Sequence, residues 1–464
     1  MKKRGVHSSL EPWDVEMGRV DNGVTAYAGL PGVIEGWYAL GLDKACQRHV
    51  RLRDRQKGLS DAEWAEVLTV LLMAGGRSLE DLEALKSDAG LCRMWPLLKK
   101  ASARSELNYL HRFQDAKMPQ ARQGRARMVP EAEGLRGLAE VNRHLIRELQ
   151  RWVSEEEATV DVDASIHESQ KREALWTYDK VRGYQPVIAY WAEQGVIVAD
   201  QFREGNVPAG MGNVGFVETA LGALPEDVKA RRVRADSGLY EQELLRGLDR
   251  KGVEFAISAD MTEELRKAVK AVAPPAWNPY TKPTPQGRWC DPKKGWAEVE
   301  FVPEEKGAKK GEGPFRYVGI RLEKNQPGLF DGRYEHFAVV TNRWTMEGNA
   351  LLNWQRQRCG TVEWAHDLLK NDLGARTFPC GKFGANAAWY RFNVLAFNLK
   401  VALTKIGLPM CEGVRPHTLR MRLLHSAARV VSHSRSLSMI FPALNASRRQ
   451  EVAGCRRRLR LSPA

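Results

Sequence analysis

The first third of the chain shows the hydrophobic spacing of helices. Ser60 and Glu63 form a capping-box pattern, and the apolar residues that follow fall on one helical face as far as Gly75. Ser78 is placed to cap a second, shorter helix, and residues 135–152 have the pattern of a long amphipathic helix. Two helices joined by a glycine turn fit a DNA-reading helix-turn-helix, but any αα-hairpin has the same pattern.

Near residue 158 the hydrophobic period changes from helical to alternating. Apolar strands are predicted at 158–163, 186–191, 195–202, 231–236 and 253–258, with helices at 214–224 and 240–250. Gln194-Gly195 is expected to form a hairpin turn between the second and third of these strands. Three consecutive strands followed by alternating helices and strands predict an α/β fold with a mixed sheet.

The composition changes again between residues 262 and 333. Six prolines lie between 274 and 292, and Lys306 to Gly313 is a Lys/Gly/Glu-rich run that predicts a loop. Alternating segments at 296–302 and 315–322 predict strands, so this region is interpreted as a β-rich insertion. A strand at 336–341 returns to the sheet, and helices are expected from about residue 346 onward.

Composition and charge narrow the class of protein. The chain has 464 residues, 43% hydrophobic and 28% charged, which is typical of a globular protein of two to four domains. It has no apolar run near the ~18 residues that span a bilayer, and its Lys-Arg start is not followed by an apolar segment, so a cytoplasmic protein is expected. Seven cysteines without a Cys-x-x-Cys pair indicate ordinary reduced thiols rather than a zinc or disulfide framework. A net charge of +14 makes nucleic acid the first partner to consider.

Most of the excess positive charge lies at the C-terminal end. Residues 415–464 contain eleven arginines, among them Arg456, Arg457 and Arg458, and one acid, Glu451. Arginine suits bidentate phosphate contacts, which favours binding to a nucleic acid backbone. The alternative is a solvated basic tail without a specific partner. Apolar spacing predicts a helix over 419–431, so the arginines are expected on a folded element.

Three acidic residues stand where rigid elements end or turn. Asp163 and Asp236 each follow an apolar strand and precede small residues, so both are expected at the carboxyl edge of the sheet. Glu363 lies on a predicted helix that carries on one face, at i+3, i+4 and i+7, His366, Asp367 and Lys370. Carboxylates so placed are the ligands that metal-dependent phosphoryl chemistry uses. Helix capping and turn formation are the alternatives for each acid alone. Asp161, on the same strand face, competes with Asp163, and Asp200 is a weaker competitor.

Several blocks around these acids together resemble the DDE transposases of bacterial insertion sequences, closest to insertion-sequence family 1380. The resemblance runs from about Thr159 to about Arg435. The blocks that carry it are Val160-Asp-Val-Asp-Ala-Ser165, Arg182-Gly-Tyr-Gln-Pro186, Arg234-Ala-Asp-Ser-Gly238, Thr341-Asn-Arg343, Glu363 with Lys370, Asn371-Asp-Leu-Gly374 and Phe383-Gly-Ala-Asn-Ala-Ala-Trp389. The spacing of Glu363 and Lys370 matches the Glu-x6-Lys part of the family's Tyr-Arg-Glu-Lys signature.

The resemblance implies a site and a fold. Asp163, Asp236 and Glu363 would be the catalytic triad and would hold two Mg²⁺ (or Mn²⁺) ions, and Lys370 would contact DNA phosphate. An RNase H-like core interrupted by a β-rich insertion before the Glu helix is also implied. The sequence departs from the signature at the Tyr and Arg positions, which hold Arg356 and Cys359. The displaced Arg358 is therefore the candidate for a second phosphate contact, and Trp354 is the nearest aromatic residue.

The sequence thus predicts a transposase that cleaves transposon ends and joins the 3′-hydroxyl to target DNA. Its expected partners are terminal inverted repeats and target DNA, with no membrane, with a homodimer in the assembled complex, and with a bacterial, nucleoid-associated location when DNA is bound. The predicted division is a helical DNA-binding domain (1–155), a core in two parts (156–261 and 334–410), the insertion (262–333) and an Arg-rich, basic helical C-terminus (411–464). A transposase-derived DNA-binding protein without catalysis, and an RNase H-fold nuclease without strand transfer, are the alternatives.

Overall fold

The computed structural model describes residues 23–53, 58–114, 126, 128–303, 313–325, 332–433 and 436–461. The predicted loop from Lys306 lies outside the described residues except for Gly313. The charged start of the chain and Arg435, one of the eleven C-terminal arginines, lie outside them as well.

Helices make up the N-terminal region, as predicted. They are α1 (Leu30–Ala39), α2 (Leu42–His49), α3 (Asp61–Ala74), α4 (Asp81–Lys86), α5 (Ala89–Met94), α6 (Ala103–Leu110) and α7 (Glu133–Trp152). The capping box is confirmed: the Glu63 amide donates to Ser60 Oγ at 3.2 Å, and the Ser60 amide donates to Glu63 Oε2 at 2.6 Å. The prediction that Ser78 caps the next helix is wrong. The helix starts at Asp81, whose carboxylate accepts from the Ser78 amide.

The burial of α3 argues against the helix-turn-helix interpretation. Twelve of its fourteen residues are buried, including Glu66, which accepts from the Tyr38 hydroxyl and the Trp95 indole. A helix enclosed on all sides has no free face for a DNA groove, and α4, which follows it, is only six residues long. The prediction of two helices is confirmed, but the pair is built into the core as an αα-hairpin.

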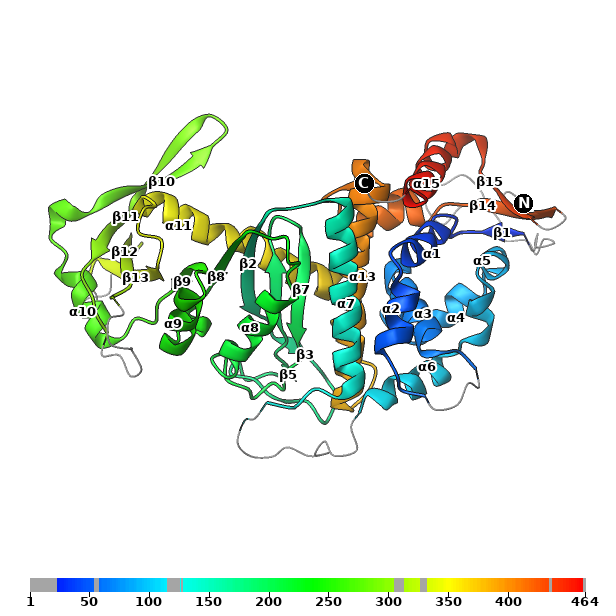
Figure 1. Cartoon of the computed structure of the whole chain (residues 1–464), viewed down its shortest axis with the longest axis horizontal. Helices are drawn as coiled ribbons and strands as arrows, with labels where there is room; N and C mark the ends of the chain where they lie inside the picture. The colour runs from blue at the N-terminus through cyan, green and yellow to red at the C-terminus, as the bar shows by residue number, and fades with distance from the viewer. Residues whose placement is uncertain are drawn as a thin grey trace, which may run out of the picture.

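The N-terminal helices and the sheet share one hydrophobic core. Helix α13 (Phe383–Ala402) joins them, because it contacts α3, α7 and strand β7 and is buried over nearly all its length. Figure 1 shows α7 and α13 standing between the sheet and the N-terminal helices. The core therefore crosses the boundary that the sequence suggests near residue 155.

A nine-stranded mixed sheet forms the other half of the molecule, in the order β10-β11-β12-β13-β9-β8-β2-β6-β7. Its strands are β2 (Glu157–Ala164), β6 (Val187–Trp191), β7 (Val196–Gln201), β8 (Ala230–Ala235), β9 (Glu254–Ser258), β10 (Asn278–Thr284), β11 (Gly287–Val299), β12 (Arg316–Glu323) and β13 (Tyr334–Thr341). Strands β2, β8 and β9 are parallel, so their carboxyl ends meet at one edge; the other pairs are antiparallel. Helices α8 (Asn213–Ala223) and α9 (Gln242–Arg250) occupy the connections, and the predicted mixed α/β sheet is confirmed.

The strands of the Pro-rich region extend the same sheet. β12 pairs with β13, which pairs with β9, so the sheet is continuous from the insertion to β7. The sequence predicts no strand at β10 because proline lacks an amide donor. Pro279 and Pro283 are accommodated since β10 is the edge strand of the sheet. Helix α10 (Glu263–Ala271), also not predicted, follows β9 and packs on β13.

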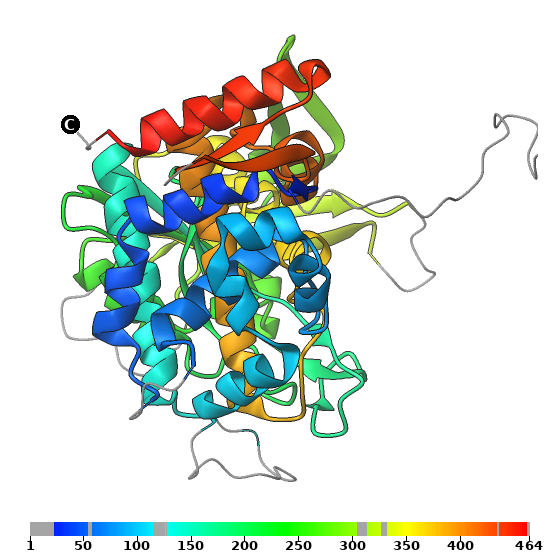
Figure 2. The ribbon, with the colours of Figure 1, turned by 90° about the vertical axis from the view of Figure 1, so that its right-hand side faces the viewer.

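The C-terminal region is only partly helical. The helix predicted over 419–431 is wrong in its second half: α14 (Pro416–Leu419) and a π-helical turn end at Leu424, and β14 (Ala428–His433) follows. β14 pairs with β15 (Ser436–Ile440) and with β1 (Val24–Thr25). The hydrophobic pattern that includes Val430 and Val431 fits a strand as well as a helix, so it did not distinguish the two. Figure 2 shows the final helix, α15 (Ala446–Leu459), lying over α1.

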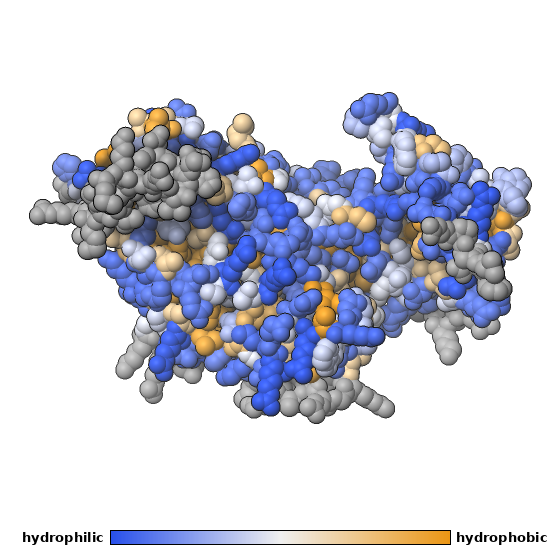
Figure 3. All heavy atoms as spheres, turned by 180° about the vertical axis from the view of Figure 1, so that it is seen from behind, coloured by the Kyte–Doolittle hydropathy of each residue, from blue (hydrophilic) through white to orange (hydrophobic). Residues whose placement is uncertain are grey.

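The face of the molecule seen in Figure 3 is mainly hydrophilic, with hydrophobic side chains in scattered patches. Among the described residues, no helix has the length and apolar character needed to cross a membrane.

Candidate active site

Two of the three predicted acids lie on adjacent parallel strands. The last registered pair of β2 and β8 is Val162 with Ala235. Asp163 and Asp236 are the next residues along the chain, so they lie side by side at the carboxyl edge of the sheet. Asp163 is still paired with Ile188 of β6, and Asp236 lies just past the end of β8. Asp236 also caps the short 3₁₀ turn Ser237–Leu239 by accepting from the Gly238 amide at 2.9 Å, which fixes its carboxylate. The capping alternative is therefore confirmed for Asp236, and its role in a metal site stays a prediction.

Asp163 lies in an electrostatically strained environment. Burial first, and then the neighbouring Asp236 and Glu363, raise the pKa of its carboxyl to about 7 against the opposing effect of Arg358. Arg358 Nη1 lies 3.7 Å from one carboxylate oxygen and His366 Nε2 lies 3.8 Å from the other. Burial lowers the pKa of His366 to about 3, so this imidazole is neutral and gives Asp163 no counter-charge. Two carboxylates far away in the sequence thus act on Asp163 here.

The third acid is carried by a short helix that continues as a π-helix. Glu363 stands exposed in the first turn of α12 (Val362–Asp367), and Lys370 lies in the π-helical turn Leu368–Asp372. The Lys370 ammonium donates to Ser165 Oγ, and burial lowers the pKa of that ammonium. Ser165 follows Asp163 by two residues, so this bond ties the helix to the end of β2. Single π-turns are frequent at functional sites, although this chain has two others, at Leu403–Gly407 and Arg420–Leu424.

The competing acid Asp161 has a different environment. It is fully buried, and its two oxygens accept from Arg234 Nε and Nη2 at 2.6 and 2.8 Å. The Thr361 hydroxyl also donates to it. Arg234 further donates to the carbonyl of Trp354 at 2.6 Å, so Asp161 serves to fasten β2 and β8 to the segment before α12.

Asp200, the weaker competitor, is likewise neutralised. Arg391 on α13 donates to both of its carboxylate oxygens at 3.0 Å and to Glu131. This buried cluster joins β7, α13 and the segment before α7, and it lies two strands from Asp163, since Ile188 of β6 pairs with Asp163 on one side and with Asp200 on the other.

The predicted DNA contacts of the C-terminal helix divide into two kinds. Arg458 is partly buried and donates to the Gly407 carbonyl at 2.9 Å, and Arg456 pairs with Glu35 at 2.6 Å. Arg457 between them is exposed. Of the remaining arginines of this region, Arg420 is buried and donates to the carbonyls of Leu72 and Met73 at the end of α3. Arg420 and Arg458 therefore help to hold the fold together, and the DNA contacts of Arg456, Arg457 and Arg458 stay a prediction.

An exposed tyrosine beside the acids escaped the sequence reasoning. Tyr178 is 72% exposed, and the pKa of its phenol is raised by burial of part of the ring and then by Asp179, Asp236 and Asp163. It lines, with Ser165 and Asp236, a small cavity of about 60 Å³. Trp354, the nearest aromatic residue to the missing signature Tyr, is covered by the guanidinium groups of Arg234 and Arg343 at 5.3 and 4.6 Å from its ring. A polar loop between two short strands gave no signal for Tyr178.

The donor set has the chemistry of a site for a hard divalent cation. Its carboxylate oxygens are the ligands such ions prefer, and the raised pKa of Asp163 shows negative charge that a cation would relieve. Within the described part of the chain, however, no three His, Cys, Asp or Glu side chains lie close enough together to form a ready-made metal site. The acids therefore fit the ion by chemistry and by location, while their side chains are not closed around a common centre.

Comparison with known proteins gives the family. The family model described as Transposase DDE domain group 1 matches residues 40–463, nearly the whole chain. Among solved structures, the chain is similar to a piggyBac transposase in a synaptic complex with hairpin DNA, with a TM-score of 0.46 and 11% identity over 86% of this chain and 80% of that chain. No curated protein matches. The chain belongs to the DDE transposase family, and this membership implies DNA as its partner and transposition as its activity.

Proposed function

We propose that this DDE transposase cuts and joins DNA at the site formed by Asp163, Asp236 and Glu363. The observation that carries the proposal is the raised pKa of Asp163 on β2, to which Asp236 after β8 and Glu363 on α12 both contribute. A buried acid whose pKa is raised by neighbouring acids at the edge of a sheet is typical of sites built for a cation or a proton transfer. Bound divalent ions would supply activation of the attacking oxygen and stabilisation of charge on the phosphate.

The residues around the acids have separate tasks in this proposal. Asp163, Asp236 and Glu363 hold the ions, and Lys370, fixed by Ser165, presents a positive charge to the scissile strand. Arg358 Nη1 lies 3.7 Å from an Asp163 carboxylate oxygen and has no hydrogen-bond partner among the described residues. Arg358 is therefore positioned to exchange this carboxylate for a DNA phosphate.

Tyr178 takes the role of the missing signature tyrosine. Its ring is exposed next to Asp163 and Asp236, whereas Trp354 is occupied by two arginines. Stacking of a base on an aromatic ring contributes about 1–3 kcal/mol, enough to orient the terminal nucleotide.

The finer assignments belong to the same proposal. The strand order β7-β6-β2-β8-β9 supports an RNase H-like core. In it, β7, β6 and β2 are antiparallel neighbours, and β8 and β9 run parallel to β2. Membership of insertion-sequence family 1380, a bacterial source with a nucleoid-associated location, two Mg²⁺ ions, a homodimer on paired DNA ends and the five-part division of the chain are proposed with it. The helical N-terminal region and the exposed arginines, including Arg457, would contact the DNA backbone.

The test uses the DNA that flanks the reading frame, as labelled ends, with a plasmid target and Mg²⁺. Asp163→Asn, Asp236→Asn and Glu363→Gln should each reduce cleavage by about 10³-fold or more, since each removes several kcal/mol of transition-state stabilisation. DNA binding should change little. Asp367→Asn on the same helix is the matched control, because Asp367 pairs with Arg415 at 2.7 Å.

The products separate the possible functions. Joined product supports transposition, nicked product alone supports a nuclease without strand transfer, and a shifted band alone supports a DNA-binding protein without catalysis. Near-wild-type cleavage by any of the three acid variants would remove that residue from the site.

A further inference from the structure

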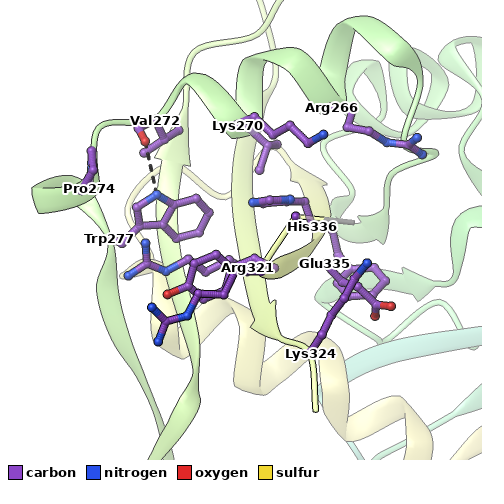
Figure 4. A pocket seen from close by; sticks show the side chains of 14 residues that line it. Arg266, Lys270, Val272, Pro274, Trp277, Arg321, Lys324, Glu335 and His336 are labelled. Carbon is purple, nitrogen blue, oxygen red and sulfur yellow. Dashed lines mark hydrogen bonds between the residues drawn. The ribbon is translucent and has the colours of Figure 1, made fainter. Parts of the chain in front are cut away.

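A second, strongly basic pocket lies on the insertion side of the sheet. A cavity of about 890 Å³ opens between α10, β12 and β13. We call it the α10 pocket; its cationic side chains, from helix and strands alike, are Arg266, Lys270, Arg321, Lys324 and Arg333. Among the described residues that line it, Glu335 is the single acid. Figure 4 shows these side chains gathered around the cavity.

Much of this charge is not neutralised within the described part of the chain. Arg333 pairs with Glu323 at 2.9 Å, but no described acidic side chain pairs with Lys270 or Arg321. Burial lowers the pKa of His336, and Lys270, Arg321 and Arg266 lower it further. The positive charges of these three side chains are therefore all felt at the His336 imidazole. Converging like charges destabilise a folded protein, and an anion removes that cost.

One of these cations is held in a fixed orientation. The Arg321 guanidinium lies 4.8 Å from the centre of the Trp277 ring and 5.0 Å from that of Tyr334. The Trp277 indole is itself anchored, since it donates to the Val272 carbonyl at 3.3 Å (Figure 4). A guanidinium packed between two rings loses little further freedom on binding phosphate, and its planar donors suit phosphate oxygens.

The pocket and the candidate active site lie at the same edge of the sheet. Ser258, the last residue of β9, pairs with Val339 of the antiparallel β13. The earlier residues of β13, from Tyr334 to Phe337, therefore extend past the carboxyl end of β9, in the direction in which Asp163 and Asp236 leave β2 and β8. Three strand spacings, about 14 Å, separate β2 from β13, and His336 lies three residues, about 10 Å, further along β13 than Val339. His336 and Arg321 are on the α10 face of the sheet, whereas Val339 and the acids are on the opposite face, so DNA that touches both would pass over the carboxyl edge.

We propose that the α10 pocket binds backbone phosphates of the DNA duplex whose strand is cut at Asp163, Asp236 and Glu363. This inference rests on the proposed function. A duplex fits better than a small free polyphosphate, because the cations are spread over a helix and two strands and share an edge with the acids. The pocket would fix the direction in which DNA leaves the site and would add affinity without reading sequence.

The test compares salt dependence of binding for variants of one helix. Arg266→Gln/Lys270→Gln removes two exposed charges of the pocket, and Lys267→Gln is the matched control, since Lys267 lies on α10 but pairs with Glu263 and does not line the cavity. Each full-length protein is titrated with a labelled 40-base-pair terminal duplex at several salt concentrations. The double variant should lower the slope of log K against log salt by about 1.8, or 0.9 for each lost contact. Lys267→Gln and the charge-keeping Arg266→Lys/Lys270→Arg should keep the wild-type slope.

Cleavage by the wild type in Mg²⁺ is measured in parallel, so the two proposals fail separately. An unchanged slope in the double variant, with wild-type cleavage intact, overturns the pocket and leaves the proposed function standing. A reduced slope without cleavage by the wild type supports the DNA contact and removes the catalytic proposal. Tripolyphosphate that raises the melting temperature of the wild type but not of the double variant, with an unchanged slope on DNA, identifies a small-polyphosphate site and overturns the DNA assignment.

Discussion

The middle of β2 and its carboxyl end carry the same side chain in opposite circumstances. Asp161, in the middle, is fully buried and receives two hydrogen bonds from Arg234. Asp163, at the end, has two other acids near it, a guanidinium at 3.7 Å and a neutral histidine. The two lie on one face of one strand, so their partners, and not the residue type or the strand face, separate the structural acid Asp161 from the proposed site residue Asp163.

The largest expected effect on stability concerns the ion pair of Asp161 with Arg234. Arg234→Met leaves Asp161 charged, buried and unpaired, and should lower the free energy of unfolding by about 3–5 kcal/mol. Arg234→Met/Asp161→Leu removes both charges and should recover much of that loss. Urea unfolding at pH 7 measures both variants. A cost below about 1 kcal/mol for the single variant would mean that Asp161 is not held as an ion, and would reopen it as a site residue.

The second prediction concerns Asp163, whose replacement should raise the free energy of unfolding at high pH instead of lowering it. Its pKa of about 7 in the folded state lies above the ordinary 3.8, so between these values the folded state binds more protons than the unfolded state. Stability contributed by the protonated form is complete below about pH 4 and is lost as the pH rises to about 7. Asp163→Asn should therefore be roughly 1–4 kcal/mol more stable than the wild type at pH 8, relative to their difference at pH 4.

Thermal or urea unfolding across pH 4–8, without divalent ions, measures this difference, and the low-pH data serve as the internal control. A difference that stays constant across the range would show that the carboxyl of Asp163 is not strained in the fold.

The smallest effect extends the comparison to two neighbouring arginines. Arg457 is exposed, whereas Arg458 donates to the Gly407 carbonyl. Arg457→Gln should lower the salt slope of DNA binding by about 0.9 and leave the melting temperature unchanged. Arg458→Gln should do the reverse, with a cost of about 1.5–3 kcal/mol for losing a charged hydrogen bond. Equal slopes for both variants would remove this helix from the DNA interface.

The sequence predicts the parts of the fold that depend on local pattern. The alternation around Asp163 and around Asp236, the capping box at Ser60 and the hairpin turn at Gly195 all specify their elements within a few residues, and each agrees with the structure. The candidate acids Asp163 and Asp236 could also be selected from the sequence, because the hydrophobic pattern shows where strands end.

Partners brought together by the fold are not visible in that pattern. Asp161 meets Arg234 because β2 and β8 are in parallel register, across 73 residues of sequence. Arg420 counts as a basic residue of the tail, yet its guanidinium satisfies the last carbonyls of α3, where a helix end attracts positive charge. The α10 pocket was missed for the same reason, since its helix cations Arg266 and Lys270 precede Arg321 on β12 by more than fifty residues of sequence.

Metal-ion rescue tests the central claim most directly, that Asp163 is a ligand of the catalytic ion. Asp163→Cys replaces a hard oxygen ligand by a thiolate, which binds Mn²⁺ better than Mg²⁺. With labelled terminal DNA, the wild type should cleave in both ions, while Asp163→Cys should be inactive in Mg²⁺ and regain measurable cleavage in Mn²⁺. Wild-type cleavage by Asp163→Cys in Mg²⁺, or equal inactivity in the two ions, would contradict the account.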